Sequence, residues 1–200
     1  ISPLRGQNNV QGCGDAGCLP THLPGYQRYT PEALEKFEAA WGAQIPNSAG
    51  MMLTEMVDGC LDGSIRAMYM VGENPLLTEP NLHHAEQALS NLDCLVVQDL
   101  FLHEAAELAH VFLPAAAFAE KEGTFTNSER RVQRVRKALD SPGEAKPDWW
   151  ITCELARRVA ERLGLPGSGF EYSHPAEIFE EMARLVPFLG GISHDRLDRE

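Results

Sequence analysis

The middle of the chain alternates short apolar runs with helical segments, and this alternation restricts the fold more than any other feature. Apolar runs at 67–71, 94–97 and 110–113 are predicted strands, and helices are predicted at about 81–89 and 103–109. Near-continuous apolar strands separated by helices are typical of a parallel sheet that is covered on both faces. We therefore predict an α/β fold with a doubly wound, mostly parallel sheet flanked by helices.

The flanking sequence suggests three parts. Residues 1–29 are rich in glycine, asparagine and cysteine, and the stretch Leu4–Tyr29 has few periodic apolar residues, so it is predicted as a long, ordered loop. Residues 30–165 form the predicted α/β domain, and 166–200 a C-terminal helical segment. Capping residues and helical apolar periodicity predict further helices at about 31–41, 51–61, 148–163 and 175–185.

Composition excludes several classes of function. The formal charge of −12 argues against a nucleic-acid surface, and no apolar run approaches the length of a membrane span. An acidic, cytoplasmic protein that binds a small ligand fits this balance better. Because the chain begins at Ile1, we expect it to be a piece of a longer polypeptide. The cysteines are scattered without a C-x-x-C pair and are interpreted as reduced thiols.

Polar residues directly follow the first predicted strand. Gly72 would let a ligand approach the backbone, while Glu73, Asn74 and Thr78 offer donors and acceptors. The G-x-G-x-x-G pattern of nicotinamide sites is absent here. An ordinary strand-to-helix turn with capping residues explains the spacing equally well, so both interpretations stay open.

The next predicted strand is followed by Gln98 and Asp99. Open α/β sheets bind ligands beyond the carboxyl ends of their strands, so this second polar pair favours a ligand site. A carboxylate beside an amide suits the edge of guanine, which presents two N–H donors side by side.

Two other patterns carry weaker signals. His103 and His110 lie seven residues apart, too far for the i, i+4 spacing of a zinc-protease helix, and are interpreted as part of a solvated helix face. A basic run stands out in this acidic chain and is either a solvated face or a contact to a diphosphate or a partner domain. It comprises Arg130, Arg131, Arg134, Arg136 and Lys137.

Several separate stretches together resemble the molybdopterin oxidoreductase family, most closely the catalytic subunit of formate dehydrogenases. They occur in the family's order and cover most of residues 3–163. These stretches are LRGQNNVQG (Leu4–Gly12), LPGYQ (Leu23–Gln27), MVGENPLLTEP (Met70–Pro80), VVQDLFLHEAAELAHVFLPAAAFAEKEGTFTNSERRVQRV (Val96–Val135) and GEAKPDWW (Gly143–Trp150).

The resemblance implies molybdenum or tungsten held by two molybdopterin guanine dinucleotides (bis-MGD). It places this chain in the central part of the subunit, with a 4Fe-4S module and the metal-ligating cysteine or selenocysteine upstream. No metal ligand is expected within the chain itself. The implied partners are formate as substrate, the remaining domains of the polypeptide and electron-transfer subunits.

The resemblance also assigns residues. Arg5 matches the active-site arginine that holds the carboxylate of formate, and Gly6 and Gln7 match positions beside cofactor and substrate. The other matching positions are assigned to one guanosine end of the cofactor, with Gly72 and Glu73 in the same turn. These positions are Asn74, Thr78, Gln98, Asp99 and Asp148.

This sequence departs from the family pattern at three places. The family often has aspartate where Asn74 stands and a hydroxyl residue where Ala115 stands. The stretch GCGDAGCLP (Gly12–Pro20) carries cysteines where relatives tend to have alanine or methionine.

The resemblance thus predicts the central part of a molybdenum or tungsten formate dehydrogenase, inactive when isolated. Three alternatives remain: another molybdopterin oxidoreductase of the nitrate reductase kind, a metal-free electron-transfer scaffold like the large subunit of complex I, or a module that simply binds a nucleotide. Retention of Arg5, Gln98 and Asp99 argues against the scaffold.

Overall fold

The structure is a computed structural model that describes residues 6–165 and 169–199. Its contacts divide the chain into two compact units. The first unit comprises the described residues of Ile1–Gly50, Phe118–Leu139 and Thr152–Glu200, and the second comprises Met51–Ala117 and Asp140–Ile151. Each unit is described by itself. The boundaries predicted after residues 29 and 165 stay a prediction.

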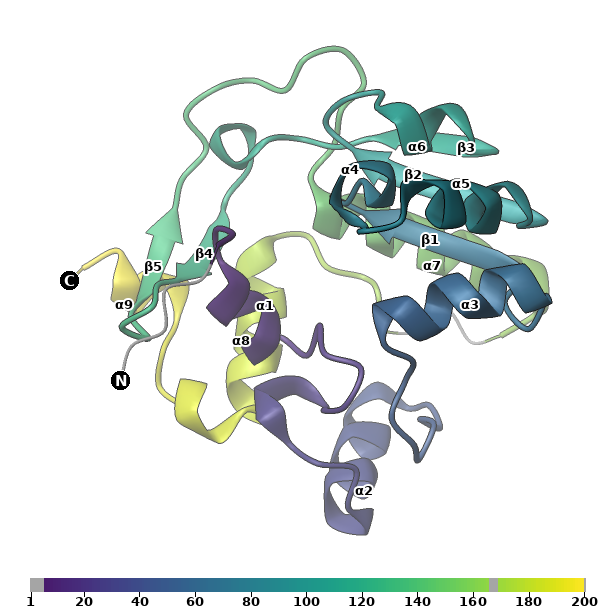
Figure 1. The fold of residues 1–200 in the computed structure, drawn as a ribbon. Helices are drawn as coiled ribbons and strands as arrows, with labels where there is room; N and C mark the ends of the chain where they lie inside the picture. The colour runs from purple at the N-terminus through teal and green to yellow at the C-terminus, as the bar shows by residue number, and fades with distance from the viewer. Residues whose placement is uncertain (1–5, 166–168, 200) are drawn as a thin grey trace. The chain divides into compact units, whose positions relative to one another are not determined.

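The second unit contains the predicted parallel sheet (Figure 1). Strands β1 (Ala67–Val71), β2 (Cys94–Asp99) and β3 (Val111–Pro114) lie side by side in that order, with Ala67 opposite Cys94 in the register of the first pair. The α/β class, with a parallel sheet flanked by helices, is confirmed. Within the described residues the strand order follows the chain without reversal.

Helices pack on this sheet through their apolar faces (Figure 1). The core joins buried side chains of strands and helices such as Leu95 and Val97 of β2, Val57 and Cys60 of one helix and Ala88 of another. The helices of this unit are α3 (Leu53–Asp62), α4 (Pro75–Thr78), α5 (Leu82–Ser90) and α6 (Glu104–Glu107). Alternating apolar positions on β2 and small residues on α5 and α6 let helix and strand approach closely.

In the first unit, the segment predicted as one loop contains a short helix, α1 (Val10–Asp15), and a 3-10 turn, η1 (Pro24–Tyr26). The prediction of a continuous loop is wrong here, because α1 lacks apolar periodicity and is held by polar contacts instead. Gln11 donates from Nε2 to Asp15 Oδ1 and to the Tyr26 hydroxyl, both at 2.9 Å. Sequence periodicity cannot detect such a helix.

The segment that follows residue 120 forms an antiparallel hairpin of β4 (Gly123–Thr126) and β5 (Val132–Val135). The Asn127 side chain shapes the turn by accepting from the backbone N–H groups of Glu129 and Arg131, each at 3.0 Å. An Asx-type turn of this kind gives a hairpin without the Asn-Gly or Asp-Gly pattern that marks the commonest ones.

The three longer ones among the remaining helices match their predicted positions, and the three short ones, of three or four residues, were not predicted. Thr30 caps one of them by accepting from the N–H of Ala33 at 3.3 Å, and Phe37 of that helix is fully buried against Leu23 and Leu185. These elements are α2 (Pro31–Trp41), η2 (Phe118–Glu120), α7 (Asp148–Leu163), α8 (Pro175–Leu185), η3 (Pro187–Leu189) and α9 (His194–Leu197).

Two residues of the basic run, Arg134 and Arg136, form ion pairs within the first unit. Arg134 is nearly buried and donates to Glu122 Oε2 and Asp198 Oδ1, both at 3.2 Å, and to the backbone oxygen of Gly123 at 3.0 Å. Arg136 pairs with Asp198 at 2.5 Å. Arg134 therefore belongs to neither a solvated face nor a diphosphate site.

A buried histidine lies beside these charges. His194 is 5% exposed, its ring contacts Phe179, and its two nitrogens are buried without a hydrogen-bond partner among the described residues. Burial lowers its pKa, and the positive charges of Arg134 and His174 add to this effect. The carboxylates of Glu122 and Asp198 act in the opposite direction but do not reverse the shift.

We expect the stability of the chain to fall as the pH falls through the ordinary histidine range near about 6.5. The lowered pKa means that the unfolded chain binds a proton at His194 more readily than the folded chain does. Thermal unfolding of the wild type and of His194→Phe across this range measures the effect. The variant should show the flatter pH dependence; equal slopes would contradict the role of His194.

Candidate functional site

Polar side chains gather at the carboxyl ends of β1 and β2 in the second unit. Because the strands are parallel and Val71 is paired with Gln98, the residues that follow β1 and the last residues of β2 share one edge of the sheet. The N–H of Gly72 donates to the backbone oxygen of Gln98 at 2.9 Å and ties the two strand ends together. The sequence therefore placed its two polar groups correctly at one edge.

The turn after β1 depends on Gly72, whose φ of 65° lies in the left-handed region. No heavy atom lies within 4 Å of the position that a Cβ would occupy there, so the backbone is open on that side. The chain then enters α4, where the Thr78 hydroxyl donates to Glu73 Oε1 at 2.6 Å. Glu73 and Thr78 thus hold each other, whereas Asn74, the N-cap residue of α4, makes no side-chain capping bond.

The two polar atoms of the Asn74 side chain have different surroundings. Its Nδ2 donates to Glu104 Oε2 at 2.8 Å, whereas its Oδ1 is buried without a partner in the described structure. The pKa of Glu104 is lowered by its own backbone N–H and by the Asn74 amide, so this carboxylate stays ionised. An orphaned buried acceptor beside a fixed donor pair is the kind of group that a ligand satisfies.

Gln98 is fully buried, and both ends of its amide are used. Its Nε2 donates to Asp148 Oδ1 at 2.7 Å, and its Oε1 accepts a short hydrogen bond from the Tyr69 hydroxyl. Three elements, β1, β2 and the first residue of α7, are linked through this amide. Gln98 therefore fixes the orientation of Asp148 in the described structure.

Asp99 is the last residue of β2 and is mostly buried. Its Oδ1 accepts from the N–H of Leu100 at 2.6 Å, and its Oδ2 lies 3.4 Å from His103 Nε2. Neither ring nitrogen of His103 has a hydrogen bond among the described residues, although both are buried. This carboxylate is thus held in one orientation with a histidine beside it.

Sequence reasoning missed three residues that take part in these contacts. His103 was interpreted as part of a solvated helix face, but its side chain is 14% exposed and faces Asp99, so that interpretation is wrong. Glu104 bonds to Asn74, and Tyr69 bonds to Gln98. The partners of Glu104 and Tyr69 lie about 30 residues away in the sequence, so the local pattern gave no signal for these two bonds. The available clues were a polar residue on a strand face and a polar residue beside a strand end.

The other predicted residues have different positions. Arg5 lies outside the described residues. Gly6 and Gln7 belong to the first unit and are exposed, with open space around the Gly6 Cα. Asp148 belongs to the second unit and joins the cluster through Gln98.

This cluster fits a guanosine-bearing cofactor. The orphaned Asn74 Oδ1 can accept from a ligand donor, and the His103 nitrogens can supply one donor and one acceptor. Asp99 presents a held carboxylate, and the open backbone at Gly72 leaves room for close approach. We name Gly72, Asn74, Asp99, His103 and Asp148, which lie at the strand ends or are joined to them through Gln98, the strand-end cluster.

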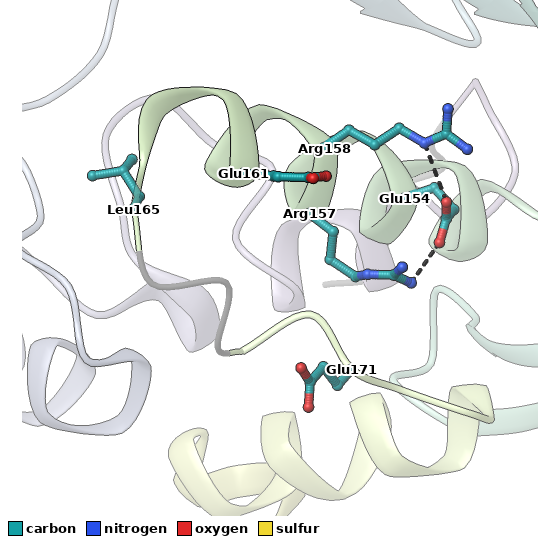
Figure 2. Close-up of a pocket in the computed structure, with 6 residues that line it drawn as sticks. All are labelled: Glu154, Arg157, Arg158, Glu161, Leu165 and Glu171. Atoms are coloured by element: carbon teal, nitrogen blue, oxygen red, sulfur yellow. Dashed lines mark hydrogen bonds and ion pairs between the residues drawn. The ribbon is translucent and has the colours of Figure 1, made fainter.

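A separate surface pocket of about 510 Å³ lies in the first unit and is lined by six residues (Figure 2). Its charges pair with one another: Glu154 bonds to Arg157 at 2.5 Å and to Arg158 at 3.3 Å. None of the predicted site residues lines it. Its lining consists of Glu154, Arg157, Arg158, Glu161, Leu165 and Glu171.

In the part of the chain that the structure describes, no group of three or more histidine, cysteine, aspartate or glutamate side chains is arranged to hold a metal ion. No helix there combines the length and the apolar character needed to cross a membrane.

The fold and the strand-end cluster are those of an open α/β protein with its polar side chains at the carboxyl ends of parallel strands. The sequence model of the molybdopterin oxidoreductase family matches residues 6–158. The chain belongs to this family, and family membership implies a molybdopterin cofactor. The resemblance inferred from the quoted stretches is confirmed.

Relatives with descriptive names support the same assignment. The chain is 45% identical over 197 residues to the probable oxidoreductase YjgC of Bacillus subtilis, and 47% identical over 198 residues to subunit alpha of the F420-dependent formate dehydrogenase 2 of Methanococcus maripaludis. Each alignment covers 98% of this chain but only 19% and 28% of the relative, respectively. The chain therefore spans about a fifth to somewhat over a quarter of these proteins.

Among solved structures, acetylene hydratase from Pelobacter acetylenicus has a similar fold, with a TM-score of 0.58. The match covers 84% of this chain and 23% of the other at 21% identity. At this identity the likeness concerns the fold alone.

Proposed function

We propose that the strand-end cluster binds the guanosine end of a molybdopterin guanine dinucleotide, and that the whole protein is a molybdenum- or tungsten-dependent formate dehydrogenase with two such groups. The observation that carries the first part is the set of buried polar atoms without a hydrogen bond on Asn74 and His103, beside the fixed carboxylate of Asp99. The second part is supported by the formate dehydrogenase names of several relatives, such as the subunit alpha of Methanococcus maripaludis.

The residues divide the work in this proposal. Asp99 accepts from the adjacent N–H groups of guanine, and Asn74 Oδ1 accepts from a further ligand donor. Gln98, which is already bonded on both sides, orients Asp148 toward the ligand. Thr78 and Glu73 keep the turn after β1 in shape. The bound cofactor supplies the metal that takes two electrons from formate.

Arg5 would hold formate in this proposal. A guanidinium stays charged when it is desolvated and pairs with a carboxylate through two parallel N–H bonds, which suits a one-carbon carboxylate. The 4Fe-4S cluster, the electron-transfer partners and the cytoplasmic location implied earlier stay predictions.

Arg5→Lys in the full-length enzyme should lower kcat/KM for formate by roughly 10²-fold, because lysine keeps the charge but loses the planar fork. Steady-state kinetics with formate measures this effect. Molybdenum or tungsten content and bound pterin are measured in parallel and should not change. Unaltered kinetics would remove Arg5 from the substrate site, and turnover of nitrate in place of formate would favour the nitrate reductase alternative.

A further inference from the structure

Helix α1 ends in a motif that places two cysteines against each other. The N–H of Cys18 donates to the backbone oxygen of Cys13 at 3.0 Å, and the N–H of Gly17 donates to that of Gly14 at 3.1 Å. Gly17 has a φ of 95°, which the reversal of the chain requires. These two bonds and the left-handed glycine define a Schellman motif, which typically brings the side chains of its first and last residues into contact.

In this motif the first and last residues are Cys13 and Cys18. Both side chains are exposed. The pKa of Cys13 is raised to about 11, first by partial burial of the sulfur and then by the hydrogen bond and the charge of Cys18. Cys13 therefore keeps its proton near neutral pH.

The other three cysteines have different surroundings. Cys60 and Cys153 are buried, and burial raises the pKa of each thiol, so they are poor nucleophiles. Cys94 is exposed like the pair but lies in β2 of the other unit. It provides an internal reference for an exposed thiol.

We propose that Cys13 and Cys18 form a redox-active dithiol that is oxidised to an internal disulfide by small-molecule disulfides. A 6→1 hydrogen bond between the backbones at the two positions holds the Cα atoms close together, and disulfides require Cα atoms about 4.4–6.8 Å apart. The two small thiols could instead serve only to pack against each other in this motif. That role does not require both of them to be exposed.

The reaction proceeds in two exchange steps. The Cys18 thiolate attacks one sulfur of the small disulfide, forms a mixed disulfide and releases one small thiolate. Cys13 then loses its proton to solvent and attacks the sulfur of Cys18, so that the Cys13–Cys18 bond forms and the second small thiolate leaves. In total, the protein dithiol loses two electrons and two protons, and one small disulfide becomes two small thiols.

The full chain, fully reduced, is incubated with oxidised glutathione, quenched by alkylation and mapped by mass spectrometry without reduction. We expect the wild type to accumulate the internal Cys13–Cys18 disulfide with no lasting glutathione adduct on Cys18, whereas Cys94 keeps its adduct, because the intramolecular closing step is faster than the bimolecular first step. Excess dithiothreitol should reopen it. If both thiols of the pair become alkylated as readily as Cys94 and no internal disulfide appears, the proposal is wrong.

Single variants separate the two roles. In Cys13→Ala the glutathione adduct should remain on Cys18, since the resolving thiol is gone, whereas in Cys18→Ala position 13 should react more slowly than Cys94. Cys94→Ala is the matched control and should leave the rate of disulfide formation unchanged. Circular dichroism establishes that each variant is folded. A wild-type adduct that persists on Cys18 without resolution would also overturn the proposal.

Discussion

Replacing Gln98 by glutamate should destabilise the second unit by about 3 kcal/mol at neutral pH, the largest effect we expect from any near-isosteric change in this chain. The side chain is fully buried and donates to Asp148 at 2.7 Å. In Gln98→Glu a buried carboxylate would face the Asp148 carboxylate with no proton between them. The bond from the Tyr69 hydroxyl can persist, because the new side chain still offers an oxygen acceptor.

The pH dependence gives this prediction its sharpest test. The introduced carboxyl should have a folded-state pKa above its unfolded value, since burial and the neighbouring carboxylate both disfavour ionisation. Its protonated form can donate to Asp148 as the amide does. The loss of stability should therefore be small below about pH 4 and grow as the pH rises.

Chemical denaturation of the wild type, Gln98→Glu and Gln98→Met across this pH range measures the effect. The methionine variant fills a similar volume without charge, so it should lose stability modestly, by about 1 kcal/mol, and without the added pH dependence. If Gln98→Glu is as stable as the wild type at neutral pH, Gln98 does not face Asp148.

The surroundings of Gln98 also show how much of the site could be predicted from the sequence. Strand β1 was predicted with its observed bounds, but β2 was expected to end at Val97 with Gln98 beyond it. In the structure β2 continues to Asp99, because Gln98 and Asp99 pair with Leu113 and Pro114 of β3. A polar side chain normally indicates that a buried strand has ended, because burying it without hydrogen bonds is costly. The strand continues through such a residue only where distant partners satisfy its polar atoms.

The local sequence pattern could not reveal the partners of Gln98. Gln98 is satisfied by Tyr69 and Asp148, which lie 29 and 50 residues away along the chain. His103 faces Asp99 because the chain turns directly after β2, which no periodicity encodes. The sequence therefore predicted which edge of the sheet carries the strand-end cluster. It did not predict which side chains hold the residues of this cluster in place.

The same limit applies to the first unit. Helix α2 was predicted from a cap and a stripe of apolar residues, both of which are local signals. Helix α1 and the β4–β5 hairpin were missed, because each depends on a side chain that bonds across the fold or turn. Asn9 shows this well: its Oδ1 accepts from the N–H of Thr126 at 2.9 Å, linking the start of α1 to the hairpin.

Asp99→Asn should reduce the discrimination of the chain between guanosine and inosine nucleotides. In our proposal the Asp99 carboxylate accepts from the two adjacent N–H groups of guanine, and inosine lacks the exocyclic amine. A hydrogen bond to a charged acceptor contributes about 1.5–3 kcal/mol, so the wild type should bind GDP roughly 10- to 100-fold more tightly than IDP. The variant keeps an oxygen for the Leu100 N–H but has lost the charge.

Isothermal titration of the full chain with GDP and IDP measures this preference. Asp93→Asn is the matched control, because Asp93 is an exposed carboxylate just before the opposite end of β2, where it pairs with Arg66. The control should keep the wild-type preference for GDP, whereas Asp99→Asn should reduce it to less than about tenfold. A preference that is the same in all three proteins would exclude Asp99 from guanine recognition, and a wild type that binds neither nucleotide would overturn the guanosine site itself. Loss of preference in Asp99→Asn alone would leave a held carboxylate at the end of β2 as the group that reads the base.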